Sequence, residues 1–431
     1  MLVSILGNLM SESLENRGFV ARSMTWVNER FPWTPTMEKH ASKYYAPKNF
    51  NVWYVFGVLA FVVLIIQLVT GLFLTMNYVP TAEGAFGSIE YAMHEVDLGW
   101  LIRYAHSTGA SAFFVVIYLH MFRGFAYGSY RKPRELIWLI GMGIYLVLMA
   151  EGFFGYLLPW GNMSYWGAQV IVSLVGAVPI VGADLAEWVR GDFVLSGITL
   201  NRFFALHVFA LPGVLVVLVF VHMVALHHVG SNNPDGIEIK DKKDEKGVPL
   251  DGIPFHPYYT VHDFFAVMVF LILFCAVMFF APEMFGYFIE KPNFEIANPI
   301  ATPDHIAPVW YYTPFYAMLR AVTFPLFGLD AKFWGLVVMA GAILIPVALP
   351  WLDKSPVKSI RYKGRISKFM LGMLVISFVV LGYLGTIPPS GFGTATAQIA
   401  TLVYFSYFLL MPWYTQREKT KPVPERVTGG H

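Results

Sequence analysis

Four histidines stand inside two long apolar segments of the 431-residue chain, and their spacing nearly repeats between the segments. His120 follows His106 at position i+14 in one segment, and His222 follows His207 at position i+15 in the other. A helix that advances by fourteen positions rises about 21 Å and returns to nearly the same face. Each helix therefore offers one imidazole near each end. Ionisable side chains inside a membrane are costly and mark functional sites, so the spacing predicts two stacked imidazole pairs.

Bis-imidazole ligation of two b-type haems, one above the other, is the chemistry that this pattern favours. Zinc fits less well, because each level offers two imidazoles and no carboxylate or thiolate is expected nearby. A hydrogen-bonded contact between helices is the alternative for any single membrane histidine. The extra residue between His207 and His222 must also be absorbed. Pro212 lies between them and predicts a wide turn near residues 208–213.

Glycine spacing on two other apolar segments matches the histidine spacing. Gly71 follows Gly57 at position i+14, and Gly155 follows Gly141 at the same interval. Because glycine lets a flat macrocycle approach the backbone, each pair can flank the same two levels. Plain packing of membrane helices is the alternative. The arginines nearest the ligands toward the membrane surfaces are Arg103, Arg123 and Arg202. They are candidates for pairing with haem propionates, and snorkelling would explain them equally well.

The composition requires that a membrane positions these residues. Apolar residues make up 56% of the chain and charged residues only 13%, whereas an ordinary globular protein has roughly 25% charged residues. This excludes a disordered chain, a nucleic-acid binder and a typical soluble enzyme. The one cysteine, Cys275, excludes an intramolecular disulfide, a thiolate cluster and a covalent haem site. The first twenty residues have no basic start and do not resemble a signal peptide.

Eight segments are long and apolar enough to cross a bilayer. They are 52–76, 104–121, 136–158, 203–226, 261–281, 333–352, 369–387 and 396–414. Both termini and the second, fourth and sixth connections then share one side, which holds 24 of the 30 Lys and Arg residues. Basic residues stay on the cytoplasmic side. We therefore expect cytoplasmic N- and C-termini and two long loops that face outward.

The predicted fold is an all-α integral membrane protein with eight transmembrane helices, the first four forming a di-haem four-helix bundle. Its parts are a cytoplasmic N-terminal segment (1–50), the bundle (51–230) with outer interfacial helices at 162–190, and a cytoplasmic loop (231–256). A C-terminal four-span part (257–415) contains an outer loop at 282–331, and a cytoplasmic tail (416–431) follows. Long ordered loops such as 282–331 are usually functional.

Several motifs spread over residues 40–415 resemble cytochrome b of the bacterial ubiquinol–cytochrome c oxidoreductase, respiratory complex III. They are Gly71-Leu-Phe-Leu, Arg103-Tyr-Ala-His106, His120-Met-Phe-Arg123-Gly, Gly155-Tyr-Leu-Leu-Pro-Trp-Gly161, Asn201-Arg-Phe-Phe-Ala-Leu-His207, Gly230-Ser-Asn-Asn-Pro234 and Pro254-Phe-His-Pro-Tyr-Tyr-Thr260. By this resemblance, His106 and His207 would hold the outer, low-potential haem iron. His120 and His222 would hold the inner, high-potential one.

The resemblance also implies the reaction and its partners. The family oxidises ubiquinol at an outward pocket and gives one electron to a Rieske-type iron–sulfur protein, with a cytochrome c-type subunit as the next acceptor. The other electron crosses both haems to reduce quinone at an inward pocket, which couples electron transfer to proton translocation. A homodimer of the complex in the bacterial cytoplasmic (inner) membrane is expected from the family alone.

The inward quinone site is implied at His227, Ser231 and Asp263. An imidazole and a carboxylate near the cytoplasmic surface can deliver the two protons that quinone reduction requires. His228 and His262 are adjacent in sequence and could share that role. A carboxylate at the start of a helix is the structural alternative for Asp263.

The outward quinol site departs from the family, because the signature Pro-Glu-Trp-Tyr reads Pro308-Val309-Trp310-Tyr311 here. Valine cannot accept a proton from quinol. The carboxylates of the loop that could replace the missing glutamate are Glu283, Glu290, Glu295 and Asp304. Alignment on Asn298-Pro299 favours Glu290 over Glu295. Other residues expected to line this pocket are Tyr156, Gly161, Tyr165, Pro308, Trp310 and Tyr311, and aromatic anchoring at the interface is the alternative for them.

Two other classes of protein share part of the pattern. A cytochrome subunit of a dehydrogenase or hydrogenase would have the histidines without the long outer loop or the Asn201–His207 and Pro254–Thr260 segments. A transporter that relays protons through membrane histidines would lack tightly bound haem.

Overall fold

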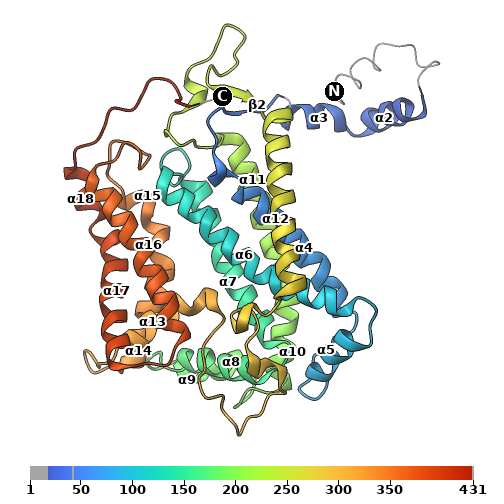
Figure 1. Cartoon of the computed structure of the whole chain (residues 1–431), viewed down its shortest axis with the longest axis vertical. Helices are drawn as coiled ribbons and strands as arrows, with labels where there is room; N and C mark the ends of the chain where they lie inside the picture. The colour runs from blue at the N-terminus through green and yellow to red at the C-terminus, as the bar shows by residue number, and fades with distance from the viewer. Residues whose placement is uncertain (1–17, 41–42, 430–431) are drawn as a thin grey trace.

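The chain is mostly helical in its computed structural model, which describes residues 18–40 and 43–429 (Figure 1). Parts of the predicted N-terminal segment (1–17 and 41–42) and the end of the predicted tail (430–431) lie outside the described residues. The α-helices are α2 (Phe19–Arg30), α3 (Trp33–His40), α4 (Phe56–Thr75), α5 (Ala85–His94), α6 (Gly99–Tyr127), α7 (Glu135–Leu157), α8 (Asn162–Val175), α9 (Gly182–Arg190), α10 (Gly197–Ala205), α11 (Leu211–Val229), α12 (Thr260–Phe280), α13 (Thr313–Ala321), α14 (Ala331–Leu344), α15 (Leu349–Leu352), α16 (Arg365–Thr386), α17 (Gly391–Leu409) and α18 (Met411–Arg417).

The predicted eight-span architecture is confirmed. Within the described chain, seven helical stretches are long and apolar enough to cross a membrane. The eighth span is the pair α17 and α18, which is bent by 56°. The second and fourth spans are longer than predicted, at Gly99–Tyr127 and Gly197–Val229. Their polar ends continue the helices beyond the apolar core, which hydrophobicity alone does not detect.

Local signals explain where the histidine-bearing helices begin and end. Helix α6 ends at Tyr127 because Gly128 adopts a left-handed conformation with φ 68°, a common helix terminator. Helix α10 begins after Ser196, whose side chain accepts a hydrogen bond from the Ile198 amide. Thr199 accepts in turn from the Ser196 amide, which completes a capping box.

The predicted wide turn in the fourth span is confirmed. Residues Leu206–Ala210 form a π-helical segment between α10 and α11, and Pro212 lies in the first turn of α11. A π-turn holds one more residue than an α-turn. It therefore absorbs the extra residue between His207 and His222 and returns both imidazoles to one face.

The histidine-bearing and glycine-bearing helices pack in pairs. Helix α4 lies against α6, and α7 lies against α10 and α11, while α12 covers α4 and α6. Helices α8 and α9 run across the lower end of this bundle in Figure 1, and α13 to α18 form a second group beside it. Buried apolar side chains of α6 and α7 join those of α13, α16 and α17 in one core.

The predicted outer loop 282–331 is only partly irregular, because it contains α13. Pro314 stands in the first turn of this helix, where its missing N–H costs nothing. One face of α13 is buried, through Phe315, Met318 and Ala321. The prolines of this segment led to the prediction of a loop, and at the start of a helix proline does not prevent helix formation.

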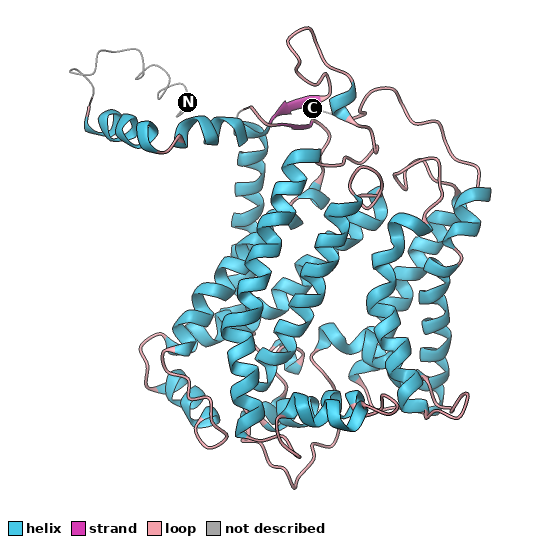
Figure 2. Cartoon of the chain, turned by 180° about the vertical axis from the view of Figure 1, so that it is seen from behind, coloured by secondary structure: helices cyan, strands magenta, loops and turns pink. Residues whose placement is uncertain are grey.

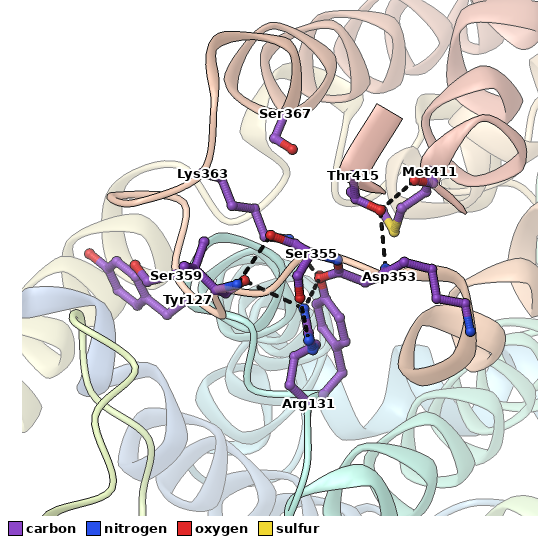
Figure 3. Close-up of polar contacts among 12 residues, drawn as sticks. Tyr127, Arg131, Asp353, Ser355, Ser359, Lys363, Ser367, Met411 and Thr415 are labelled. Carbon is purple, nitrogen blue, oxygen red and sulfur yellow. Dashed lines mark hydrogen bonds and ion pairs between the residues drawn. The ribbon is translucent and has the colours of Figure 1, made fainter. Parts of the chain in front are cut away.

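The end of the bundle opposite α8 and α9 is closed by a short strand pair and a buried ionic cluster. Strand β1 (Tyr45–Pro47) pairs antiparallel with β2 (Gly252–Pro254), and Figure 2 shows them above the helices. In Figure 3, Lys363 and Arg131 converge on Asp353, with nitrogen–oxygen distances of 2.6 and 3.1 Å. Burial raises the pKa of Asp353, but the two positive charges outweigh it and hold the pKa below its ordinary value. The cluster ties the connection after α6 to the connection before α16.

Candidate functional site

The outer pair of histidines has the geometry of two ligands on one metal. The rings of His106 and His207 are 6.2 Å apart between centroids and nearly perpendicular, at 88°. Two metal–imidazole bonds of about 2 Å each, plus the distance from each nitrogen to its ring centre, sum to about 6 Å. The Nδ1 atoms are engaged elsewhere, by Thr70 Oγ1 at 2.9 Å and by the Glu151 carbonyl at 3.0 Å. The Nε2 atoms are therefore the ones left available to bind a metal.

Each predicted glycine faces one histidine. A side chain at Gly71 would contact His106 Cε1 at 3.2 Å, and one at Gly155 would overlap His207. The same holds at the other level, where Gly57 faces His120 at 3.5 Å and Gly141 faces His222 at 3.3 Å. Together with the His106–His207 ring pair, these contacts sort the eight residues into an outer level (Gly71, Gly155, His106, His207) and an inner level (Gly57, Gly141, His120, His222).

The inner level carries buried polar atoms without partners. Within the described residues, the Nδ1 atoms of His120 and His222 and the Nε atom of Arg123 are buried and make no hydrogen bond. The Arg123 guanidinium lies 4.9 Å from the centre of the Tyr54 ring. Unpaired buried donors are costly. An anionic group such as a haem propionate beside Arg123 would remove this cost for the guanidinium, so Arg123 fits a haem at this level.

The other two predicted arginines differ from each other. Arg103 lies three residues before His106, about one helical turn away on α6. Arg202 is exposed, and its guanidinium donates to the Trp188 carbonyl at 2.5 Å. It packs against Gly191 at the end of α9. Arg202 thus links α9 to α10, and its pairing with a haem propionate stays a prediction.

Among residues 18–40 and 43–429, no group of three or more His, Cys, Asp or Glu side chains is placed to hold a metal ion. One expectation about the outer level is wrong, however. Sequence reasoning expected no carboxylate there, but Glu151 Oε1 lies 3.0 Å from His207 Nδ1. Because it approaches Nδ1 and not Nε2, Glu151 does not add a ligand for zinc.

Two of the predicted outward-site residues, Tyr156 and Gly161, lie around the carboxylate of a third, Glu290. The Tyr156 hydroxyl donates to Glu290 Oε2 at 2.9 Å, and Asn293 Nδ2 donates to the same oxygen at 3.0 Å. Gly161 leaves room for Asn293, whose Oδ1 would lie 2.6 Å from a side chain added there. Asn293 was missed by sequence reasoning, because one asparagine in a proline-rich loop gives no signal.

Glu290 is suited to accept a proton near neutral pH. Burial raises the pKa of Glu290 to about 7, although Tyr156 and Asn293 donate hydrogen bonds that favour the carboxylate. Glu295, its rival, is exposed. Burial and then the charge of Glu290 raise the pKa of Tyr311, which places Tyr311 close to the same carboxylate.

The Pro308–Tyr311 segment packs into the main hydrophobic core, through Val309 and Tyr311. Tyr311 is 3% exposed and stacks on Phe114, with ring centroids 3.8 Å apart. Trp310 Nε1 donates to Ser111 Oγ at 3.1 Å. Val309 is buried, at 3% exposure. Tyr165 lies in a separate core cluster, against Trp160 at 5.4 Å.

The inward-site candidates lie beneath the N-terminal segment. His227 stacks on Tyr44, with ring centroids 4.8 Å apart. Burial raises the pKa of Tyr44, and its hydrogen bond to Ser231 partly offsets that rise. Arg134 donates to the Ser231 carbonyl at 3.2 Å. Tyr44 and Arg134 were missed, because neither belongs to an apolar segment or a recognisable motif.

Asp263 belongs to the same corner of the molecule. His262 Nδ1 lies 3.6 Å from Asp263 Oδ1 at the start of α12. Tyr259, one turn earlier, donates from its hydroxyl to the Pro47 carbonyl at 2.5 Å. The strand pair therefore brings Tyr44 and the start of α12 together, and the structure supplies an imidazole beside Asp263.

An eight-span helical bundle with two levels of paired histidines defines a membrane-embedded b-type cytochrome. Residues 41–230 match the family model "Cytochrome b/b6/petB", and residues 296–405 match "Cytochrome b(C-terminal)/b6/petD". The cytochrome b of Allochromatium vinosum is 63% identical over 410 residues, which cover 94% of this chain and 98% of that protein. The cytochrome b of Rhodospirillum rubrum is 46% identical, covering 94% and 96%.

A solved structure agrees with the sequence comparisons. A chain described as "Hyperthermophilic respiratory Complex III" superposes with a TM-score of 0.84 at 36% identity, covering 91% of this chain and 99% of that chain. The chain therefore belongs to the cytochrome b family, as a core subunit of the complex III type. It is a multi-pass membrane subunit of an oxidoreductase that carries haem b.

Proposed function

We propose that the chain oxidises ubiquinol at an outward, periplasmic pocket and reduces quinone at an inward pocket, as the core of ubiquinol–cytochrome c oxidoreductase. The observation that carries this proposal is the sorting of four histidines and four glycines into two levels of one bundle. When bound, two b haems would carry one electron from the outward to the inward pocket. The bundle 51–230 would hold both haems, and the part 257–415 with its loop 282–331 would complete the outward pocket.

The ligands follow from the two levels. His106 and His207 would hold the outer, low-potential haem, and His120 and His222 the inner, high-potential one. Arg123 is the proposed propionate partner, supported by its buried and unpaired Nε atom. Each level has one histidine from α6 and one from the α10–α11 span, which is what a bundle-core haem requires.

At the outward pocket, Glu290 would accept a proton from quinol in place of the glutamate that Val309 replaces. Its carboxylate is buried beside Tyr156 and Tyr311, with a pKa of about 7. A general base works best when its pKa lies near the working pH. Tyr156 and Asn293 would hold the carboxylate oriented, and Gly161 would keep space beside them.

At the inward pocket, His227 and Asp263 would supply protons to quinone, with Ser231 as a hydrogen-bonding group. Tyr44 would cover the inward pocket, since its ring stacks on His227 and it forms a hydrogen bond with Ser231. His262 would support Asp263 from 3.6 Å. The strand pair β1–β2 would keep this cover in place.

The partners would be a Rieske-type iron–sulfur protein and a cytochrome c-type subunit, in a homodimeric complex. The similarity to a chain of a respiratory complex III supports the two partner subunits, and the homodimer is proposed from the family alone. The bacterial relatives support the cytoplasmic (inner) membrane as its location. The charge distribution supports cytoplasmic N- and C-termini.

A potentiometric reduced-minus-oxidised spectrum of the purified complex tests the proposal. We expect two b-type components, of which His207→Leu removes the lower-potential one and His222→Leu the higher. His94→Leu, at an exposed position of helix α5, should leave both. Absence of a haem signal would favour a proton-relaying transporter. Insensitivity to outward-site and inward-site quinone analogues would favour the cytochrome subunit of another enzyme.

A further inference from the structure

The surroundings of the histidine Nδ1 atoms differ between the two levels. At the outer level, His106 Nδ1 lies 2.9 Å from Thr70 Oγ1, and His207 Nδ1 lies 3.0 Å from both the carbonyl and the carboxylate of Glu151. At the inner level, the Nδ1 atoms of His120 and His222 have no side-chain acceptor in the described part of the chain. Only the outer level of the described bundle therefore offers a negative charge to a ligand N–H.

The helix repeat shows why Glu151 occupies this place. It lies four residues before Gly155, and the absence of a side chain at Gly155 lets the His207 ring reach the preceding turn. Ile137 holds the equivalent position at the inner level, four residues before Gly141. The His222 ring approaches the backbone carbonyl of Ile137 there, although its Nδ1 atom makes no full hydrogen bond within the described residues. An apolar side chain thus stands at the inner level where the outer level has a carboxylate.

One oxygen of the Glu151 carboxylate, Oε1, lies 3.0 Å from His207 Nδ1. The side chain is 16% exposed, and its second oxygen, Oε2, is buried with no hydrogen-bond partner within the residues described. Tyr312, from the start of α13, donates to the Met149 carbonyl at 2.6 Å and covers this turn of α7. Within the described chain, Oε2 makes no hydrogen bond. The close polar contact of the carboxylate is therefore the one between Oε1 and the His207 imidazole.

We infer that Glu151 is a positioning residue that lowers the reduction potential of the outer haem through His207. This inference rests on the proposed function, in which His207 is an axial ligand. An N–H donated to a carboxylate makes the imidazole a stronger electron donor, which stabilises the oxidised iron. The negative charge also opposes the electron that reduction adds in a medium of low dielectric constant. Ile137 gives the inner haem no such effect.

The difference between Glu151 at the outer level and Ile137 at the inner level favours electron transfer from the outer haem to the inner haem. Moving one charge against 100 mV across the membrane costs about 2.3 kcal/mol. The inner haem must therefore accept electrons more readily than the outer one. A carboxylate beside the outer ligand and an isoleucine at the matching inner position supply a step of the required sign.

Redox titration of the intact complex carrying Glu151→Gln tests the inference. The variant keeps the shape of the side chain and removes its charge. We expect the ferrous-to-ferric ratio of the outer haem to rise about tenfold at a fixed ambient potential, a shift of about 59 mV for one electron. The inner haem should titrate unchanged, and the electron paramagnetic resonance g-values of the outer ferric haem should move. The control is Glu295→Gln, which neutralises an exposed glutamate of the outer loop. It should change the reduction potential of neither haem.

A second variant, Glu151→Thr, should shift the outer haem in the same direction. The inference is overturned if both variants retain the outer haem with its potential and g-values unchanged. Loss of the outer haem from both variants would overturn it as well, because a residue that tunes the potential is not needed to hold the haem. If the unmodified complex lacks two b-type components, the proposed function itself fails, which is a separate result.

Discussion

Replacing Glu290 by glutamine should abolish the pH dependence of quinol oxidation at the outward pocket. Glutamine keeps the size of the side chain and can still accept from Tyr156 and Asn293, but it cannot take a proton. With a pKa of about 7, the unmodified carboxylate is about one-tenth ionised at pH 6 and about nine-tenths at pH 8. Its rate should therefore rise about tenfold over this range.

The variant should lose both the rise and most of the rate. A positioned general base contributes typically 10²- to 10⁴-fold, so we expect a fall of at least about 100-fold at pH 8. The assay is pre-steady-state reduction of the b haems by quinol, with the inward pocket blocked by an inhibitor. Glu295→Gln is the matched control and should keep the rate and the pH profile.

Stability offers an independent measure of the same pKa. The folded-state pKa of Glu290 is raised from 4.5 to about 7, so the folded chain binds the proton more tightly than the unfolded chain. Stability should therefore fall as pH rises from 4.5 to 7 and remain lower above it. The difference between the two pKa values corresponds to about 3 kcal/mol. Glu290→Gln should remove this loss, so that it raises the free energy of unfolding at pH 8 and not at pH 4.5.

In the kinetic assay, a normal rate and a normal pH profile of quinol oxidation in Glu290→Gln would refute Glu290 as the proton acceptor.

Three further substitutions test other parts of the molecule. Gly155→Ala should reduce outer-haem affinity about 5- to 150-fold, because an added side chain overlaps His207. Such overpacking costs about 1–3 kcal/mol. The haem content of the purified complex measures the effect. Asp353→Asn should lower the free energy of unfolding by about 3–5 kcal/mol, since it leaves Lys363 buried without its counter-charge; denaturant unfolding measures this. Asp263→Asn should slow quinone reduction at the inward pocket about 100-fold, through loss of a proton donor, as measured with the outward pocket inhibited.

Each of these substitutions has a control on the same chain. Gly143→Ala lies on the same helix as Gly155, and its nearest neighbour is Leu218 at 4.0 Å; equal haem loss in both would contradict a specific overlap with His207. Asp304 is exposed, so Asp304→Asn should leave stability within about 0.5 kcal/mol. Unchanged stability in Asp353→Asn, or unchanged inward-site kinetics in Asp263→Asn, would contradict the roles assigned to those carboxylates.

The histidine and glycine repeats were readable from the sequence because both follow the helix period. Their shared spacing fixes depth and face together, and the extra residue in the fourth span demanded the π-helical segment found at Leu206–Ala210. The spans were readable because a bilayer accepts only long apolar helices. The ends of the spans and α13 were not, because their polar residues and Pro314 carry no signal that separates helix from loop.

The side-chain partners of the site depended on packing that no local pattern records. Glu290 could be favoured by alignment, but Asn293, which holds its carboxylate, could not. Tyr44 reaches His227 only because β1 pairs with β2, a strand that lies far along the chain beyond the fourth span. Arg202 was a candidate partner for a propionate, with snorkelling as the alternative, and no sequence pattern predicted that its guanidinium reaches the Trp188 carbonyl of α9. Glu151 could have been noticed, since it stands before Gly155 as Ile137 stands before Gly141.

An anomalous-difference map at the iron absorption edge, from crystals of the purified complex, tests the central claim most directly. Two iron peaks should lie inside the bundle about 21 Å apart, the rise of a helix over the histidine spacing. One should lie between His106 and His207 and the other between His120 and His222. Iron at neither position, or at one level alone, would contradict the account.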